Sequence, residues 1–146
     1  MRAVIQRVSQ ASVRINDEIT TEINKGMVVM LGIAHNDTRD DAESLANKIV
    51  NLRIFPDAEE KMNLSVIDIK GSLLVISNFT LYANSNKGNR PNFIQAAKPM
   101  DAMPIYDYFV EYLRNNTQIE IQSGVFRAMM EVTLTNDGPV TIILEK

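Results

Sequence analysis

Two long apolar runs constrain the fold of this chain more than any other feature of its sequence. Residues 27–34 and residues 72–81 contain no charged side chain, and Gly26 and Gly71 stand directly before them. A strand with one face in water would alternate apolar and polar residues, so continuous runs are typical of strands that are covered on both faces. The sequence therefore predicts a sheet whose central strands are buried on both sides.

Shorter patterns flank these two strands. Residues 12–15 alternate, Asn16 and Asp17 are turn formers, and residues 18–23 continue the pattern, which predicts a hairpin. Apolar residues at helical spacing follow a polar cluster and predict a helix over about residues 40–52.

A second helix is predicted to begin at Asp101 as its cap, with Pro104 tolerated in the first turn. Its apolar stripe is formed by Ile105, Tyr108, Phe109, Tyr112 and Leu113. Two strands near residues 131–135 and 140–144 close the chain. Many strands with two helices, not in strict alternation, predict a single α+β domain over residues 1–146. We expect mixed or antiparallel sheets, barrel- or sandwich-like, with the two main helices packed on them.

The composition excludes several classes of chemistry. There is no cysteine, which removes disulfides and thiolate catalysis, and the single histidine, His35, is predicted to face water at a strand end. The acids between Asp37 and Glu43 stand where a helix N-terminus attracts acids, so no metal site is predicted. No glycine-rich nucleotide motif occurs, so no cofactor is expected. The sequence has neither a signal peptide nor an apolar stretch of the ~20 residues that span a bilayer, so we expect a cytoplasmic protein without a membrane partner.

Two segments are candidates for a functional site. Residues 77–81 end a buried strand in hydroxyl and amide groups, which either mark a strand that emerges into a loop or line a pocket with freed backbone N–H groups. The long loop after Tyr82 could close one side of that pocket. In the second segment, Asp137-Gly138 is an ordinary hairpin signal, but Pro139 stands where the return strand should begin and cannot donate to a ladder. Spacing alone favours a plain turn there, and a protruding turn with outward carbonyls is the alternative.

Taken together, these segments resemble the D-aminoacyl-tRNA deacylase family from end to end. The matching stretches are residues 3–8 with 11–13, 53–55 with 61–64, 77–81, 88–91, 106–110 and 136–141. Their order and spacing make the resemblance specific. One departure is that the family's active-site stretch usually reads Ser-Gln-Phe-Thr, whereas this chain has Asn78, whose side chain is one methylene shorter.

The resemblance implies a homodimer that hydrolyses D-aminoacyl-tRNA, and also glycyl-tRNA mischarged on a non-cognate tRNA. A cis Gly138-Pro139 turn, supported by Arg7, would enter the partner's active site, hold the α-amino group and exclude L-side chains. The pocket residues would be Ser77, Asn78, Phe79 and Thr80, with backbone N–H groups as an oxyanion hole. The terminal adenosine of the tRNA would occupy a neighbouring pocket.

The net charge of −3 argues against a basic nucleic-acid binder. We therefore expect no DNA partner and few tRNA phosphate contacts, near Lys87, Arg90 and Lys98. Three other readings stay open at this point. The protein could be a module that binds a small amine or a nucleotide end without chemistry, a metal-dependent hydrolase built on His35, or a deacylase that uses Thr80 as a covalent nucleophile.

Overall fold

The fold is organised around one long strand that pairs with three others. The computed structural model describes residues 1–146, apart from the side chain of Ile19. Its main sheet consists of β1 (Arg2–Ile15), β2 (Glu18–Ile23), β3 (Gly26–Gly32), β6 (Ser72–Ser77), β7 (Glu120–Ser123) and β8 (Glu131–Glu145). The strand order is β2-β1-β3-β6-β7, and β8 pairs with β1 as well. A second, two-stranded sheet joins β4 (Phe55–Pro56) to β5 (Met62–Leu64).

The sheet is mixed, as predicted. β3 runs parallel to β6, and β6 runs parallel to β7, while β1 is antiparallel to each of its partners. β3 and β6 approach closely at Gly26, where an added Cβ would lie 1.9 Å from the carbonyl oxygen of Ser72. The predicted hairpin is also confirmed, because β1 and β2 pair across Asn16 and Asp17, both with positive φ.

The closing strands differ from the prediction. Residues 131–135 and 140–144 do not form a hairpin with each other, because both belong to β8 and both pair with β1. The first part of β8 lies beside the second half of β1, and the last part lies beside its first half. Between the pairs Val8–Asn136 and Gln6–Thr141, residues 137–140 of β8 lie opposite the single residue Arg7. The Asp-Gly signal therefore marks an outward bulge in one strand.

Both helices were located correctly, with errors at their N-termini. α1 (Arg39–Val50) begins one residue before the predicted start, since Thr38 and Asp41 form a capping box. α2 (Pro99–Asn116) begins after Lys98, so Asp101 lies in its first turn and is not the cap. For the same reason Pro104 lies inside the helix and not in its first turn, where it was predicted. The buried stripe of α2 also differs, since it includes Tyr106 and Val110. The phenol of Tyr106 can be buried there because its hydroxyl donates to the carbonyl oxygen of Val75 over 2.9 Å.

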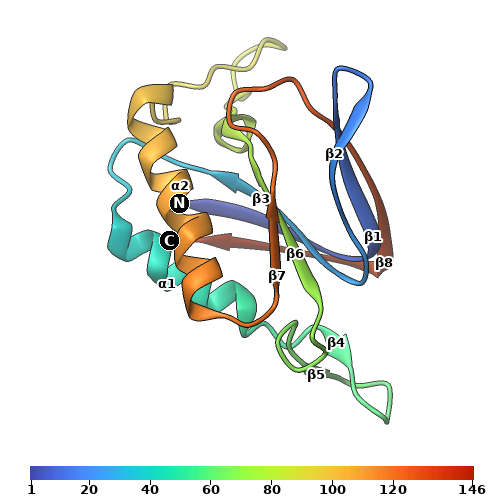
Figure 1. Ribbon diagram of the computed structural model, residues 1–146. Coiled ribbons are helices and arrows are strands. Elements are labelled where there is room, and N and C mark those ends of the chain that lie inside the picture. Colours follow the sequence, from blue (N-terminus) through green and yellow to red (C-terminus); the bar gives the residue numbers. More distant parts are fainter.

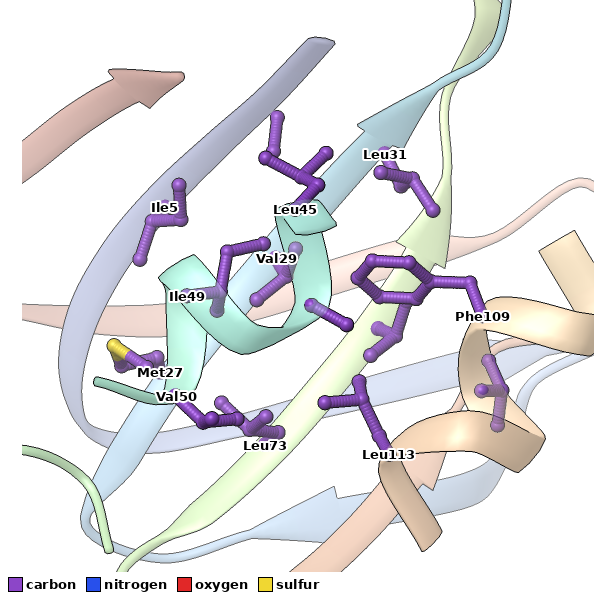
Figure 2. Packing of buried hydrophobic residues seen from close by; sticks show 14 of the residues in the cluster. Ile5, Met27, Val29, Leu31, Leu45, Ile49, Val50, Leu73, Phe109 and Leu113 are labelled. Atoms are coloured by element: carbon purple, nitrogen blue, oxygen red, sulfur yellow. The ribbon is translucent and has the colours of Figure 1, made fainter. Parts of the chain in front are cut away.

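The two helices cover one face of the sheet, and the strands fold over the other (Figure 1). Figure 2 shows apolar side chains of α1 and α2 meeting those of β1, β3 and β6, among them Leu45, Phe109, Ile5, Val29 and Leu73. A second cluster on the opposite face is formed by Val8, Ala11, Val13, Ile23, Val28, Leu74 and Ile76. Both faces of β3 and β6 are thus buried, as their continuous apolar runs predict, and the fold is α+β with a sheet that is nearly barrel-shaped. In the described residues, no helix has the length and apolarity needed to cross a membrane.

Candidate active site

The first candidate segment begins where β6 ends. After Ser77, the backbone N–H of Asn78 still donates to the carbonyl oxygen of Leu31 over 2.8 Å, and the chain then turns into a short 3₁₀ helix, η1 (Phe79–Tyr82). Asn78 caps this helix, because its side-chain oxygen accepts from the N–H of Thr80 at 3.1 Å and from the Thr80 hydroxyl at 2.5 Å. Sequence reasoning left the role of position 78 open, and its shorter amide holds both polar groups of Thr80 in this structure.

A pocket of about 650 Å³ lies beside this strand end. Its walls come from the ends of β3 and β6, the loop before α2, the first turn of α2, and the turn between β7 and β8. The lining residues are Leu31, Ile33, Ser77, Asn78, Phe79, Phe93, Ala96, Ala97, Lys98, Pro99, Ala102, Phe126, Arg127, Ala128, Met129 and Met130. Thr80 is not among them, so only three of the four predicted pocket residues line this cavity. Phe79 is 57% exposed, and its ring packs edge-on against that of Phe93, with centroids 5.0 Å apart.

Few hydrogen-bonding groups are available where η1 borders the pocket. Among the described residues, the backbone N–H of Phe79 has no hydrogen-bond partner, while that of Thr80 is held by Asn78. The hydroxyl of Thr80 also donates to the amide oxygen of Asn78, which is not a base near neutral pH. A free N–H beside an apolar cavity is suited to hydrogen-bond a developing oxyanion.

Arg2 holds the far end of η1 in place. Its guanidinium donates to the carbonyl oxygen of Leu81 over 2.5 Å and lies 4.9 Å from the ring centre of Tyr82. Burial, followed by the charge of Asp37, raises the pKa of Tyr82 to about 12, so this phenol stays protonated at neutral pH. The segment that carries Asn78 and Thr80 is therefore supported at both of its ends.

The second candidate segment is the bulge of β8 opposite Arg7. The Gly138–Pro139 peptide bond is cis, as the resemblance implies. Arg7, only 8% exposed, donates from Nε to the carbonyl oxygen of Asp137 at 3.0 Å and from Nη1 to that of Ile54 at 2.6 Å. Gly138 has φ 128°, and an added Cβ there would lie 2.8 Å from Nη2 of Arg7. Arg7 therefore joins the bulge, through Asp137, to the buried backbone of Ile54.

The pocket and the bulge do not meet within this chain. The pocket's lining residues all lie between Leu31 and Met130, whereas Gly138 and Pro139 are exposed on the bulge. Of the predicted phosphate contacts, Lys98 lines the pocket, while Lys87 and Arg90 lie on an exposed loop that the Asn84–Asn92 bridge closes.

The residues considered for metal or triad chemistry are engaged elsewhere. His35 is exposed, and its Nε2 lies 2.8 Å from the carbonyl oxygen of Ile94. Asp37 pairs with the amino group of Met1 at 2.6 Å, and Asp41 belongs to the capping box of α1. Within the residues that the structure describes, no group of three or more metal-ligating side chains comes together.

Sequence reasoning missed the wall formed by residues 126–130. This segment connects β7 to β8. Its Phe126, Arg127 and methionines line the pocket because the fold places these two strands beside segments that are far away in the sequence. Two consecutive methionines, Met129 and Met130, in a stretch without helical or strand period were the available signal.

The chain is similar to known proteins along nearly its whole length. The family described as D-Tyr-tRNA(Tyr) deacylase matches residues 4–145. D-aminoacyl-tRNA deacylase from Fusobacterium nucleatum is 57% identical over 99% of this chain and 95% of its own, and that of Thermosipho melanesiensis is 51% identical over 99% and 97%.

Two solved structures share the fold. A protein named c-Myc DNA Unwinding Element Binding Protein superimposes with a TM-score of 0.96 at 42% identity, covering 100% of this chain and 99% of its own. A second, described as a probable eukaryotic D-amino acid tRNA deacylase, has a TM-score of 0.83 over 98% and 97% of the chains, and at 16% identity it shows the fold alone. Because the family matches residues 4–145 and these relatives are more than 50% identical over 99% of the chain, this protein belongs to the D-Tyr-tRNA(Tyr) deacylase family and is a hydrolase.

Proposed function

We propose that this protein hydrolyses the ester bond between a D-amino acid and the terminal ribose of tRNA, releasing the free D-amino acid and tRNA. Relatives that are more than half identical along the chain carry the name D-aminoacyl-tRNA deacylase. The observation that carries the proposal is the partner-free N–H of Phe79 on the wall of an apolar pocket large enough for a nucleoside and an amino acid.

The chemistry needs orientation more than a strong base. An aminoacyl ester is already activated, and water attacks its carbonyl carbon to give a tetrahedral oxyanion, which collapses with the ribose hydroxyl as the leaving group. The N–H of Phe79 stabilises that oxyanion, and the N–H of Thr80 joins it when the side chain of Asn78 moves aside. Each positioned donor of this kind contributes about 10²–10³ in rate. Thr80 does not serve as a covalent nucleophile, because its hydroxyl donates to an amide oxygen and not to a base.

Selection of the D-isomer comes from the bulge of a second subunit. In the proposed homodimer, Gly138 and Pro139 of one chain enter the pocket of the other, and their carbonyl oxygens hold the substrate's α-ammonium group. Support comes from the exposure of these two residues, from the hydrogen bond of Arg7 to the preceding Asp137, and from the absence of residues 136–141 among the described residues that line their own subunit's pocket. Backbone placed this way excludes an L-side chain, and it cannot exclude glycine, so glycyl-tRNA is a second substrate.

The tRNA is bound mainly through its 3′ end. The terminal adenosine occupies the apolar part of this same pocket near Phe93 and Phe126, and not a separate neighbouring pocket as expected from the resemblance. Lys87 and Arg90 contact the backbone from the exposed loop. With a net charge of −3, these contacts are few and the salt dependence of binding is shallow. A tRNA substrate also fits the cytoplasm as the compartment of this activity.

Subunit complementation tests the cross-subunit site. Phe79→Pro removes the N–H that is proposed to bind the oxyanion, at the first residue of η1, where proline is tolerated. Gly138→Ala places a Cβ 2.8 Å from Arg7, so each variant alone should be inactive on D-aminoacyl-tRNA. In a mixed dimer, the Gly138→Ala subunit still has an intact pocket and receives an intact bulge from the Phe79→Pro subunit. One site per mixed dimer is then complete and activity returns. If the bulge worked within its own subunit, each chain would carry one defect and mixing would restore nothing.

A further inference from the structure

Among the described residues that line the pocket, two are cationic and none is acidic. Lys98 lies at the start of α2, and Arg127 lies in the turn between β7 and β8, so the two charges come from different elements that line the same cavity. Both side chains are exposed, and no ion pair or hydrogen bond found among the described residues involves either side chain. The protein as a whole is acidic, so this positive rim is a local feature.

Arg127 occupies a backbone position that does not favour it. The turn is closed by a hydrogen bond of 3.2 Å from the N–H of Ala128 to the carbonyl oxygen of Val125, and Arg127, its third residue, has φ 66°. Turns with a left-handed third residue usually have glycine or asparagine there. A long charged side chain held in a disfavoured conformation at the edge of a pocket is a pointer to function.

Arginine also differs from the other residues of this wall in what it recognises. Its guanidinium offers a planar fork that matches two oxygens of a phosphate, and it stays charged at all relevant pH values. The remaining lining residues are mostly apolar, which suits a base or an amino-acid side chain but not a phosphodiester.

We propose that Arg127, together with Lys98, binds a phosphodiester of the tRNA 3′ terminus as the terminal nucleoside enters the pocket. This inference rests on the proposed function, and it assigns substrate binding to a residue outside the matched deacylase motifs. Arg127 is here a binding residue for the nucleic-acid part of the substrate, with no role in the bond-breaking step.

The test compares two substrates that share the same ester. One is a D-aminoacyl-tRNA, and the other is the corresponding D-aminoacyl-adenosine, which has no phosphate. Arg127→Gly should raise KM for the tRNA substrate about tenfold, equivalent to ~1.4 kcal/mol, and leave its kcat unchanged. Both KM and kcat for the adenosine substrate should stay at the wild-type values. Because glycine suits φ 66°, this variant should melt at the same temperature as the wild type or higher.

Two further variants separate the effect of the Arg127 charge from the effect of its backbone conformation. Arg127→Gln removes the charge without the gain in backbone freedom and should show the same rise in KM. Lys48→Gln removes an exposed cation of α1 outside the pocket and should change neither KM nor kcat on either substrate. The salt slope of uncharged tRNA binding should become shallower by about 0.7 per lost phosphate contact in both Arg127 variants, and stay unchanged in Lys48→Gln.

Equal effects of Arg127→Gly on the two substrates, or no effect on the tRNA substrate and its salt slope, would overturn the assignment. A wild-type protein that hydrolyses neither substrate would instead refute the proposed function. In that case the binding of uncharged tRNA still decides whether Arg127 contacts a phosphate.

Discussion

Arg7 offers the most quantitative test of how the bulge is held. Its guanidinium is 8% exposed and donates to two backbone oxygens, that of Ile54 in the interior and that of Asp137 in the bulge. A hydrogen bond from a charged group contributes about 1.5–3 kcal/mol when it is buried. The bond to Ile54 is fully buried and is taken at the upper end of that range. The ion pair of Arg7 with the Asp137 carboxylate adds little, because that side chain is 44% exposed. Arg7→Met should therefore lower the free energy of unfolding by ~3 kcal/mol.

The chain provides a matched control for this variant. Arg53 also makes two hydrogen bonds, both at 2.8 Å and both to Asn63, but it does so on an exposed surface. Urea unfolding at one protein concentration should therefore give a clearly smaller loss for Arg53→Met than for Arg7→Met. The Arg7 variant, assayed where it is folded, should also hydrolyse D-aminoacyl-tRNA at least about tenfold more slowly, because the bulge has lost its brace. Equal losses for the two variants, or full activity of Arg7→Met, would refute this reasoning.

Three further outcomes follow from the same structure. Thr80→Ala keeps the backbone amide, so its kcat should fall by less than about tenfold, and trapping an acyl group on Thr80 by mass spectrometry would contradict the mechanism. His35→Ala and exhaustive chelation should each leave D-aminoacyl-tRNA hydrolysis within about twofold, and a loss of orders of magnitude in either would indicate a base or a metal that the account lacks. Asn63 and then the N–H groups of Lys61 and Glu59 lower the pKa of Asp57 below its usual 3.8. The contribution of Asp57 to stability is therefore present above its pKa in the unfolded chain and is lost as pH falls through its pKa in the folded protein. The free energy of unfolding should thus fall more steeply below about pH 4 for wild type than for Asp57→Asn. Parallel plots of stability against pH would show that this carboxylate is not involved.

Local periodicity explains the elements that the sequence predicted well. The buried residues of α1 are those that the helical spacing gave, and the continuous apolar runs became β3 and β6 because both faces of these strands are covered. Cap positions were less accurate, since Asp101 and Lys98 differ by only one turn of helix and either could begin α2.

Long-range pairing is the part that sequence alone did not give. An Asp-Gly pair between two strand-like segments looks the same whether the segments pair with each other or both pair with a third strand. Here β1 is long enough to pair with both halves of β8, and the bulge opposite Arg7 absorbs the extra residues. The wall of residues 126–130 was hidden for the same reason, since it reaches the pocket through the placement of β7 and β8.

The central claim is that one site distinguishes the two mirror-image esters, and the most direct measurement compares them. Wild-type protein is given matched D- and L-aminoacyl-tRNAs carrying the same side chain on the same tRNA, and release of the amino acid is followed over time. We expect the D-ester to be hydrolysed at least ~100-fold faster than its L-counterpart. Equal rates on the two esters would contradict the proposed selection by the bulge, and binding of both without hydrolysis would mean that the pocket is a recognition module and not an enzyme.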